Sequence, residues 1–107
     1  MDDPESPVDN DLYHIALACR SIVTAIDRVT RTGEVRVQSQ AVAIMMPTLR
    51  KGRRERSYSH SVTNFRIAEE VLTALSEGRA PDPGSMKTAR TYFAGLAELC
   101  DSARFGP

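Results

Sequence analysis

The sequence lacks most of the features that reveal a function directly. Its 107 residues include no tryptophan, three tyrosines, three phenylalanines and two cysteines. Two cysteines are too few for a disulfide scaffold, and no apolar run approaches the ~20 residues of a membrane span. The acidic start has no apolar segment typical of a signal peptide. We therefore expect a cytoplasmic protein with no membrane contact.

The formal net charge is zero, because 14 basic side chains balance 14 acidic ones. The chain as a whole is therefore not drawn to nucleic acid or to a membrane surface. One segment departs from this balance, with the basic residues Arg50, Lys51, Arg53, Arg54 and Arg56. This basic segment has three interpretations: a phosphate-binding site for DNA or RNA, a solvated connector, or a patch that docks on an acidic surface.

No arrangement of residues typical of catalysis or metal binding stands out. His14 and Cys19 are five residues apart on a predicted helix and diverge by about 140°. His60 lies among serines, a composition more typical of a solvated linker than of a catalytic triad. Glu69 and Glu70 are adjacent and diverge by about 100° on a helix. We expect no enzyme activity, no cofactor and no metal.

The clearest structural signal is an amphipathic helix over residues 12–29. Its apolar positions recur at intervals of three and four and, together with Ala16 and Val23, fall within an arc of about 140°. They are Leu12, Ile15, Cys19, Ile22, Ile26 and Val29. Ser6 is the predicted N-cap with Pro7 at the first helical position, Asp9 or Asn10 being alternative caps, and Gly33 ends the helix. Such a helix is expected to pack against others.

Residues 34–49 give a weaker signal. Val35, Val42 and Leu49 share one helical face, whereas residues 34–38 alternate like a short strand. No second strand is evident for pairing, so a helix over residues 35–45 is favoured. Pro47 predicts a break or kink at Met46, and the basic segment 50–56 is then a connector.

Two further helices are predicted in the second half of the chain. One runs from an N-cap at Ser61 to about Glu77, carries an apolar arc of roughly 220° and stops at Gly78. A stiff turn over residues 80–84 follows. Ser85 then caps a last helix whose apolar positions again alternate by three and four. These positions are Met86, Ala89, Phe93, Leu96, Cys100 and Ala103.

These elements predict an all-α protein, a small bundle of three to four helices with short connections. An acidic lead over residues 1–7 precedes a single helical domain over residues 8–107. The apolar arcs are generous for a domain of this size, and the surplus favours a homodimer. A monomer that buries the whole surplus is the alternative.

Some apolar residues lie outside the predicted seams or widen them. Such side chains either extend the core or anchor a protein–protein surface. The candidate partner-binding residues are Tyr13, Leu17, Ile67, Val71, Tyr92 and Leu99.

Three stretches carry a resemblance to a known family: the acidic lead, residues 14–20 (HIALACR) and residues 65–70 (FRIAEE). With these stretches the chain resembles the small anti-activators of bacterial quorum sensing. The resemblance implies a cytoplasmic helical homodimer that binds the ligand-binding domain of a LuxR-type transcription factor, stops it from dimerising and so removes it from DNA. The alternative is a small nucleic-acid-binding regulator that uses the basic segment.

Overall fold

The computed structural model describes residues 7–56 and 62–105, which form four α-helices and no strand. They are α1 (Pro7–Thr32), α2 (Val35–Arg56), α3 (Val62–Ser76) and α4 (Pro83–Phe105). The prediction of a small all-α bundle is thus confirmed. The lead was predicted over residues 1–7; its last residue, Pro7, is the first residue of α1, and the rest of it lies outside the described residues, as do the predicted caps Ser6 and Ser61.

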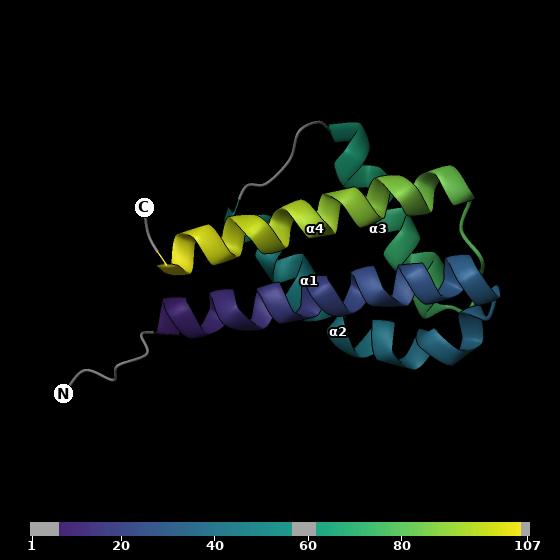
Figure 1. The fold of residues 1–107 in the computed structure, drawn as a ribbon, viewed down its shortest axis with the longest axis horizontal. Helices are drawn as coiled ribbons and strands as arrows, with labels where there is room; N and C mark the ends of the chain where they lie inside the picture. Colours follow the sequence, from purple (N-terminus) through teal and green to yellow (C-terminus); the bar gives the residue numbers. More distant parts are fainter. Residues whose placement is uncertain (1–6, 57–61, 106–107) are drawn as a thin grey trace.

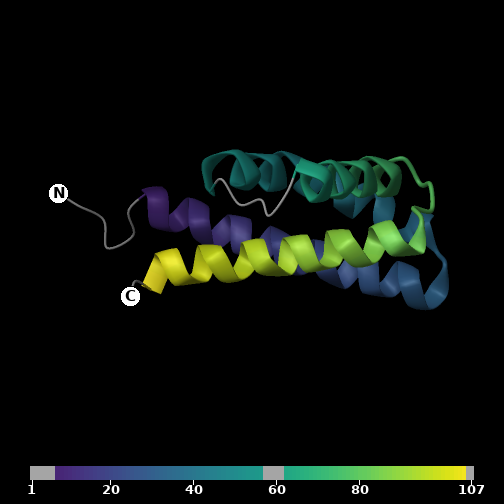
Figure 2. The same ribbon diagram turned by 90° about the horizontal axis from the view of Figure 1, so that it is seen from above.

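The helices form a bundle in which each contacts its neighbours in chain order and α4 closes against α1. In Figure 1, α1 and α4 run side by side in front, and α2 and α3 lie behind them. Figure 2 shows the same two layers from above. None of the helices, over the residues the structure covers, is long and apolar enough to cross a membrane.

The core lies between the seams predicted for the first and last helices. All six predicted seam positions of α1 are buried, as are five of the six in α4, Met86 to Cys100. The side chain of Ala103 lies outside the described part. From α2 and α3 the core receives Val42, Leu49, Leu72 and Leu75, all fully buried. Burial of apolar surface, which contributes about 25 cal/mol per Å², is the main stabilising force of such a bundle.

Two glycines end helices as the sequence predicted. Gly33 (φ 74°) donates its N–H to the Val29 carbonyl at 2.8 Å and closes α1. Gly78 (φ 77°) follows α3, where the N–H of Arg79 bonds to the Ala74 carbonyl at 2.8 Å. Both glycines adopt the left-handed conformation, which glycine adopts without steric cost because it has no Cβ.

The end of the second helix differs from its prediction. α2 does not stop near Met45 but passes through Pro47 and continues to Arg56, so residues 35–38 are helical and the basic segment 50–56 is no connector. Pro47 removes one backbone hydrogen bond and crowds the preceding turn. The turn after it is fixed by tertiary contacts: Leu49 is fully buried, and Arg50 pairs with Glu69 of α3 at 2.6 Å.

The start of the fourth helix also differs. Asp82, not Ser85, is the N-cap, since its Oδ2 accepts the Ser85 N–H at 3.1 Å, and Pro83 is the first helical residue. Proline suits this position because its missing N–H would have no partner there in any case. The predicted turn therefore ends at Asp82, and Gly84 belongs to the helix.

Replacing Asp82 by alanine is expected to lower the free energy of unfolding by about 1 kcal/mol, because the Ser85 N–H loses its acceptor. Urea unfolding followed by circular dichroism measures the change. Ser85→Ala is the matched control and should stay within about 0.5 kcal/mol of the native protein. A larger loss in Ser85→Ala than in Asp82→Ala would restore Ser85 as the cap.

Candidate protein-binding face

The outer side of α2 carries the most exposed large apolar side chains of the described residues. Ile44 is 72% exposed and Val37 is 68% exposed. Ala41 is exposed between them, which completes an i, i+4, i+7 stripe along one line of the helix. The stripe is on the side away from the buried Val42, so it is not part of the core.

Two contacts identify the flank of α2 that turns toward α3. Arg50 bonds to Glu69 of α3 at 2.6 and 3.1 Å, and the Arg36 side chain lies 3.6 Å from the Cβ position of Gly78, just after α3. At about 100° per residue, Ile44 lies about 80° around the helix from Arg36, about 120° from Arg50 and about 160° from the buried Val42. The stripe therefore occupies the outer side of α2, and Ala41, about 140° from Arg36 and about 180° from Arg50, marks its edge away from α3.

The outer side of α1 supplies Leu17 and Ser21, both exposed. Arg20 and Asp27 pair with Asp101 and Arg90 of α4 and so mark the α4 flank of this helix. Leu17 lies about 60° from Arg20, on the outer side of α1 opposite its buried seam. We define the α1–α2 face by these exposed residues: Leu17, Ser21, Val37, Ala41 and Ile44.

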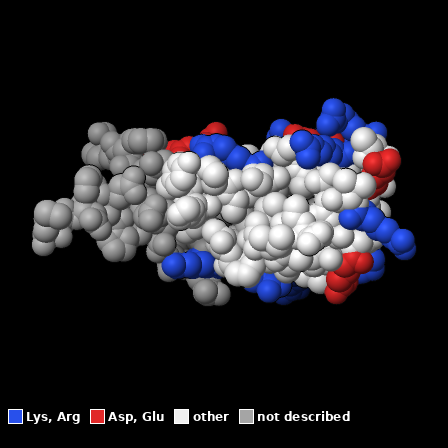
Figure 3. Space-filling model, turned by 90° about the horizontal axis from the view of Figure 1, so that it is seen from below, with Lys and Arg blue, Asp and Glu red and all other residues white. Residues whose placement is uncertain are grey.

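Figure 3 shows the molecule from the side on which α1 and α2 lie. The middle of this side is a broad surface without lysine, arginine, aspartate or glutamate, and charged side chains gather toward its edges. An uncharged centre with a charged rim is the usual anatomy of a protein–protein interface.

The six predicted partner-binding residues fall into three groups. Tyr13 and Leu17 of α1 are each 43% exposed, and Leu99 of α4 is 37% exposed. Ile67 is half-buried and packs against the core. Val71 and Tyr92 are buried, at 1% and 3% exposed, so they extend the core and offer no surface in the folded chain.

The ring contacts of Tyr92 explain why its position on the helical wheel did not predict its burial. Its ring lies edge-on to Phe93, with centroids 5.3 Å apart, and edge-on to Phe65 of α3 at 6.5 Å. Aromatic pairs of this geometry are stabilising beyond the area they bury. The neighbouring helix α3 thus covers a residue that lies at the edge of the α4 seam.

The basic segment is only partly described. Arg50 forms a two-nitrogen hydrogen bond with Glu69, and this bond raises the pKa of the Arg50 guanidinium. Lys51 is half-buried. The side chains of Arg53, Arg54 and Arg56 lie outside the described part, as does His60, and only the helical backbone of the three arginines is placed.

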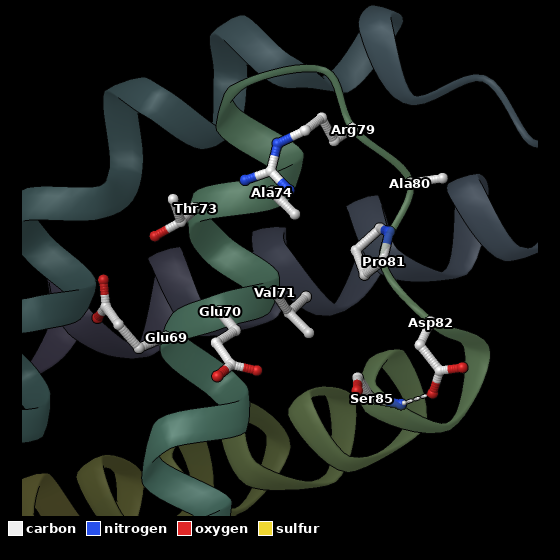
Figure 4. A pocket seen from close by; sticks show the side chains of 10 residues that line it. All are labelled: Glu69, Glu70, Val71, Thr73, Ala74, Arg79, Ala80, Pro81, Asp82 and Ser85. Atoms are coloured by element: carbon white, nitrogen blue, oxygen red, sulfur yellow. Dashed lines mark hydrogen bonds between the residues drawn. The ribbon is translucent and has the colours of Figure 1, made fainter.

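A hollow of about 470 Å³ lies between α3, the connection 77–82 and the start of α4 (Figure 4). Three of its four charged side chains have structural roles: Glu69 pairs with Arg50, Arg79 bonds to Glu77 at 2.5 Å, and Asp82 caps α4. The fourth, Glu70, is exposed. Its lining supplies no cysteine or histidine. The described residues also contain no cluster of three metal-ligating side chains.

Comparison of the chain with protein-family models, with curated proteins and with solved structures gives no match.

Proposed function

We propose that this chain is a non-enzymatic inhibitor that docks on another protein through the α1–α2 face. The observation that carries the proposal is the stripe of exposed apolar side chains on α2, together with the exposed Leu17 of α1. The proposed partner is the ligand-binding domain of a LuxR-type transcription factor, which is what the resemblance of residues 14–20 and 65–70 implies. A homodimer is part of the proposal, as the generous apolar surface favours one.

The side chains of the stripe suit this role energetically. Complete burial of a valine or isoleucine contributes about 1.5–3 kcal/mol relative to exposure. Both are β-branched and hold few rotamers on a helix, so docking costs them little side-chain entropy. Val37 and Ile44 are already presented by a packed helix, so a partner does not have to order them.

Inhibition then needs no contact with DNA. A dimeric activator binds two half-sites, and its affinity for DNA depends on holding its two DNA-binding domains together. An apolar helix face that covers the dimer surface of one subunit competes with the second subunit. Separation of the subunits removes most of the affinity for DNA.

Salt dependence tests the proposal against nucleic-acid binding through the basic segment. We expect affinity for a LuxR-type ligand-binding domain to change less than about threefold between 50 and 200 mM salt, since apolar burial releases no counterions. Binding to DNA through five cations would instead weaken by about 500-fold over this range. Fluorescence anisotropy with each labelled partner measures both.

The variant R53A/R54A/R56A separates the two candidates. It should bind the receptor domain as the native chain does. Tight, salt-sensitive binding of DNA that this variant loses, with no binding of the receptor domain, would overturn the proposal.

A further inference from the structure

The register of α1 against α4 brings the two cysteines of the chain to the same level. Arg20 pairs with Asp101, and Asp27 pairs with Arg90 at 2.7 Å. The higher-numbered residue of α1 therefore pairs with the lower-numbered residue of α4, so the two helices are antiparallel. The middle of the two registers that these ion pairs define places Cys19 level with Cys100.

The cysteines also share the interior side of the pair. Cys19 and Cys100 are both fully buried members of the core, and both are present as thiols. Ala16 and Ala97, also buried, lie three residues from Cys19 and Cys100, respectively. Small side chains at these levels let two helices approach closely, toward the lower end of the 8–10 Å usual between helix axes.

The ionisation of Cys19 is consistent with this neighbourhood. Burial raises the pKa of the Cys19 thiol to about 12, and the Cys100 thiol is the second cause of the rise. At neutral pH the thiolate form that attacks a disulfide is therefore rare at Cys19. The folded interior therefore makes the pair slow to react with a disulfide.

We propose that Cys19 and Cys100 are a latent disulfide site, which a low-molecular-weight disulfide such as glutathione disulfide oxidises to lock α1 onto α4. The proposal is independent of the α1–α2 face. One protein thiolate attacks the small disulfide and releases one small thiolate, which takes up the proton that the protein thiol gave up. The second protein thiolate then attacks the mixed disulfide, forms the Cys19–Cys100 bond and releases the second small thiol. The protein loses two hydrogens, and one glutathione disulfide becomes two glutathiones.

The reaction requires α1 and α4 to separate briefly, because both sulfur atoms are buried. Once formed, the bond closes a loop of about 80 residues, a length for which a disulfide compatible with the native packing is strongly stabilising. A disulfide formed under oxidising conditions would thus stabilise the bundle for as long as it stays intact.

The test compares thiol–disulfide equilibrium in the native and unfolded full-length chain. Reduced and oxidised protein are each equilibrated with mixtures of glutathione and glutathione disulfide, in buffer and in 6 M guanidinium, and intact mass reports the loss of two hydrogens. We expect the equilibrium constant for the intramolecular disulfide to be about 30- to 1,000-fold larger in the native chain. Peptide mapping should place the bond between Cys19 and Cys100.

Three results would overturn the proposal: a native constant equal to or below that of the unfolded chain, glutathione adducts on both cysteines, or disulfides between chains. Thermal unfolding is the second measurement, and the oxidised protein should unfold about 10 °C or more above the reduced one. Cys100→Ser is the control and should show neither the mass loss nor the shift. Both the thiol–disulfide equilibrium and the thermal unfolding are measured on the unmutated chain, so neither result depends on whether Cys100→Ser folds.

Discussion

Replacing Ile44 by aspartate is expected to weaken binding of the receptor domain at least 100-fold, which corresponds to about 2.7 kcal/mol. In the free protein the new carboxylate stays in water, because the position is 72% exposed. In the complex it would lie at the centre of the interface without a partner, where a buried charge is strongly unfavourable. The free energy of unfolding should fall by less than about 1 kcal/mol, as aspartate is only a moderately poor helix former.

Ala43→Asp is the matched control, with the same new side chain one residue away on the same helix. Ala43 is exposed but lies about 100° around from Ile44, on the flank toward α3. Titration calorimetry should show near-native affinity for this control. Equal losses in both variants, or native affinity of Ile44→Asp, would remove the α1–α2 face from the account.

Replacing Phe93 by alanine is expected to lower the free energy of unfolding by about 3–5 kcal/mol. Phe93 is the largest of the fully buried side chains, lies at the middle of the α4 seam and contacts the Tyr92 ring. Its removal leaves a cavity in addition to the lost apolar burial. Because a domain of this kind has about 5–15 kcal/mol of stability in total, the variant should be close to unfolding at 37 °C.

The same substitution at a surface position provides the comparison. Phe65 is 39% exposed at the start of α3, and Phe65→Ala should cost less than half as much. Urea unfolding of the native chain and both variants, followed by circular dichroism, gives the three free energies. A loss in Phe65→Ala as large as in Phe93→Ala would show that the core is not centred on the α1–α4 seam.

The fold was largely predictable because two seams carry most of the core. The three- and four-residue spacing in α1 and α4 has one physical meaning, a continuous apolar stripe, and the structure buries it as expected. The course of α2 was not predictable from its own sequence. Pro47 disfavours the helix locally, and only the burial of Leu49 and the ion pair of Arg50 with α3 explain why the helix continues.

The candidate site was predicted less well than the fold. Leu17 was found because it lies off a strong seam, whereas Val37 and Ile44 were missed because their segment was ambiguous between helix and strand. Their seven-residue spacing, on the side opposite Val42, was the available signal. Val71 was misplaced for another reason: how much of a broad apolar arc is covered depends on neighbouring helices, which a single helical wheel does not contain.

Light scattering coupled to size exclusion tests the central claim most directly, on the full-length chain, on a dimeric LuxR-type ligand-binding domain and on their mixture. The account predicts a discrete complex that contains a single receptor subunit, with loss of the receptor dimer. Ile44→Asp should leave the receptor dimer intact under the same conditions. A mixture that elutes as the two separate proteins, or a complex that retains the receptor dimer, would contradict inhibition by competition for the dimer surface.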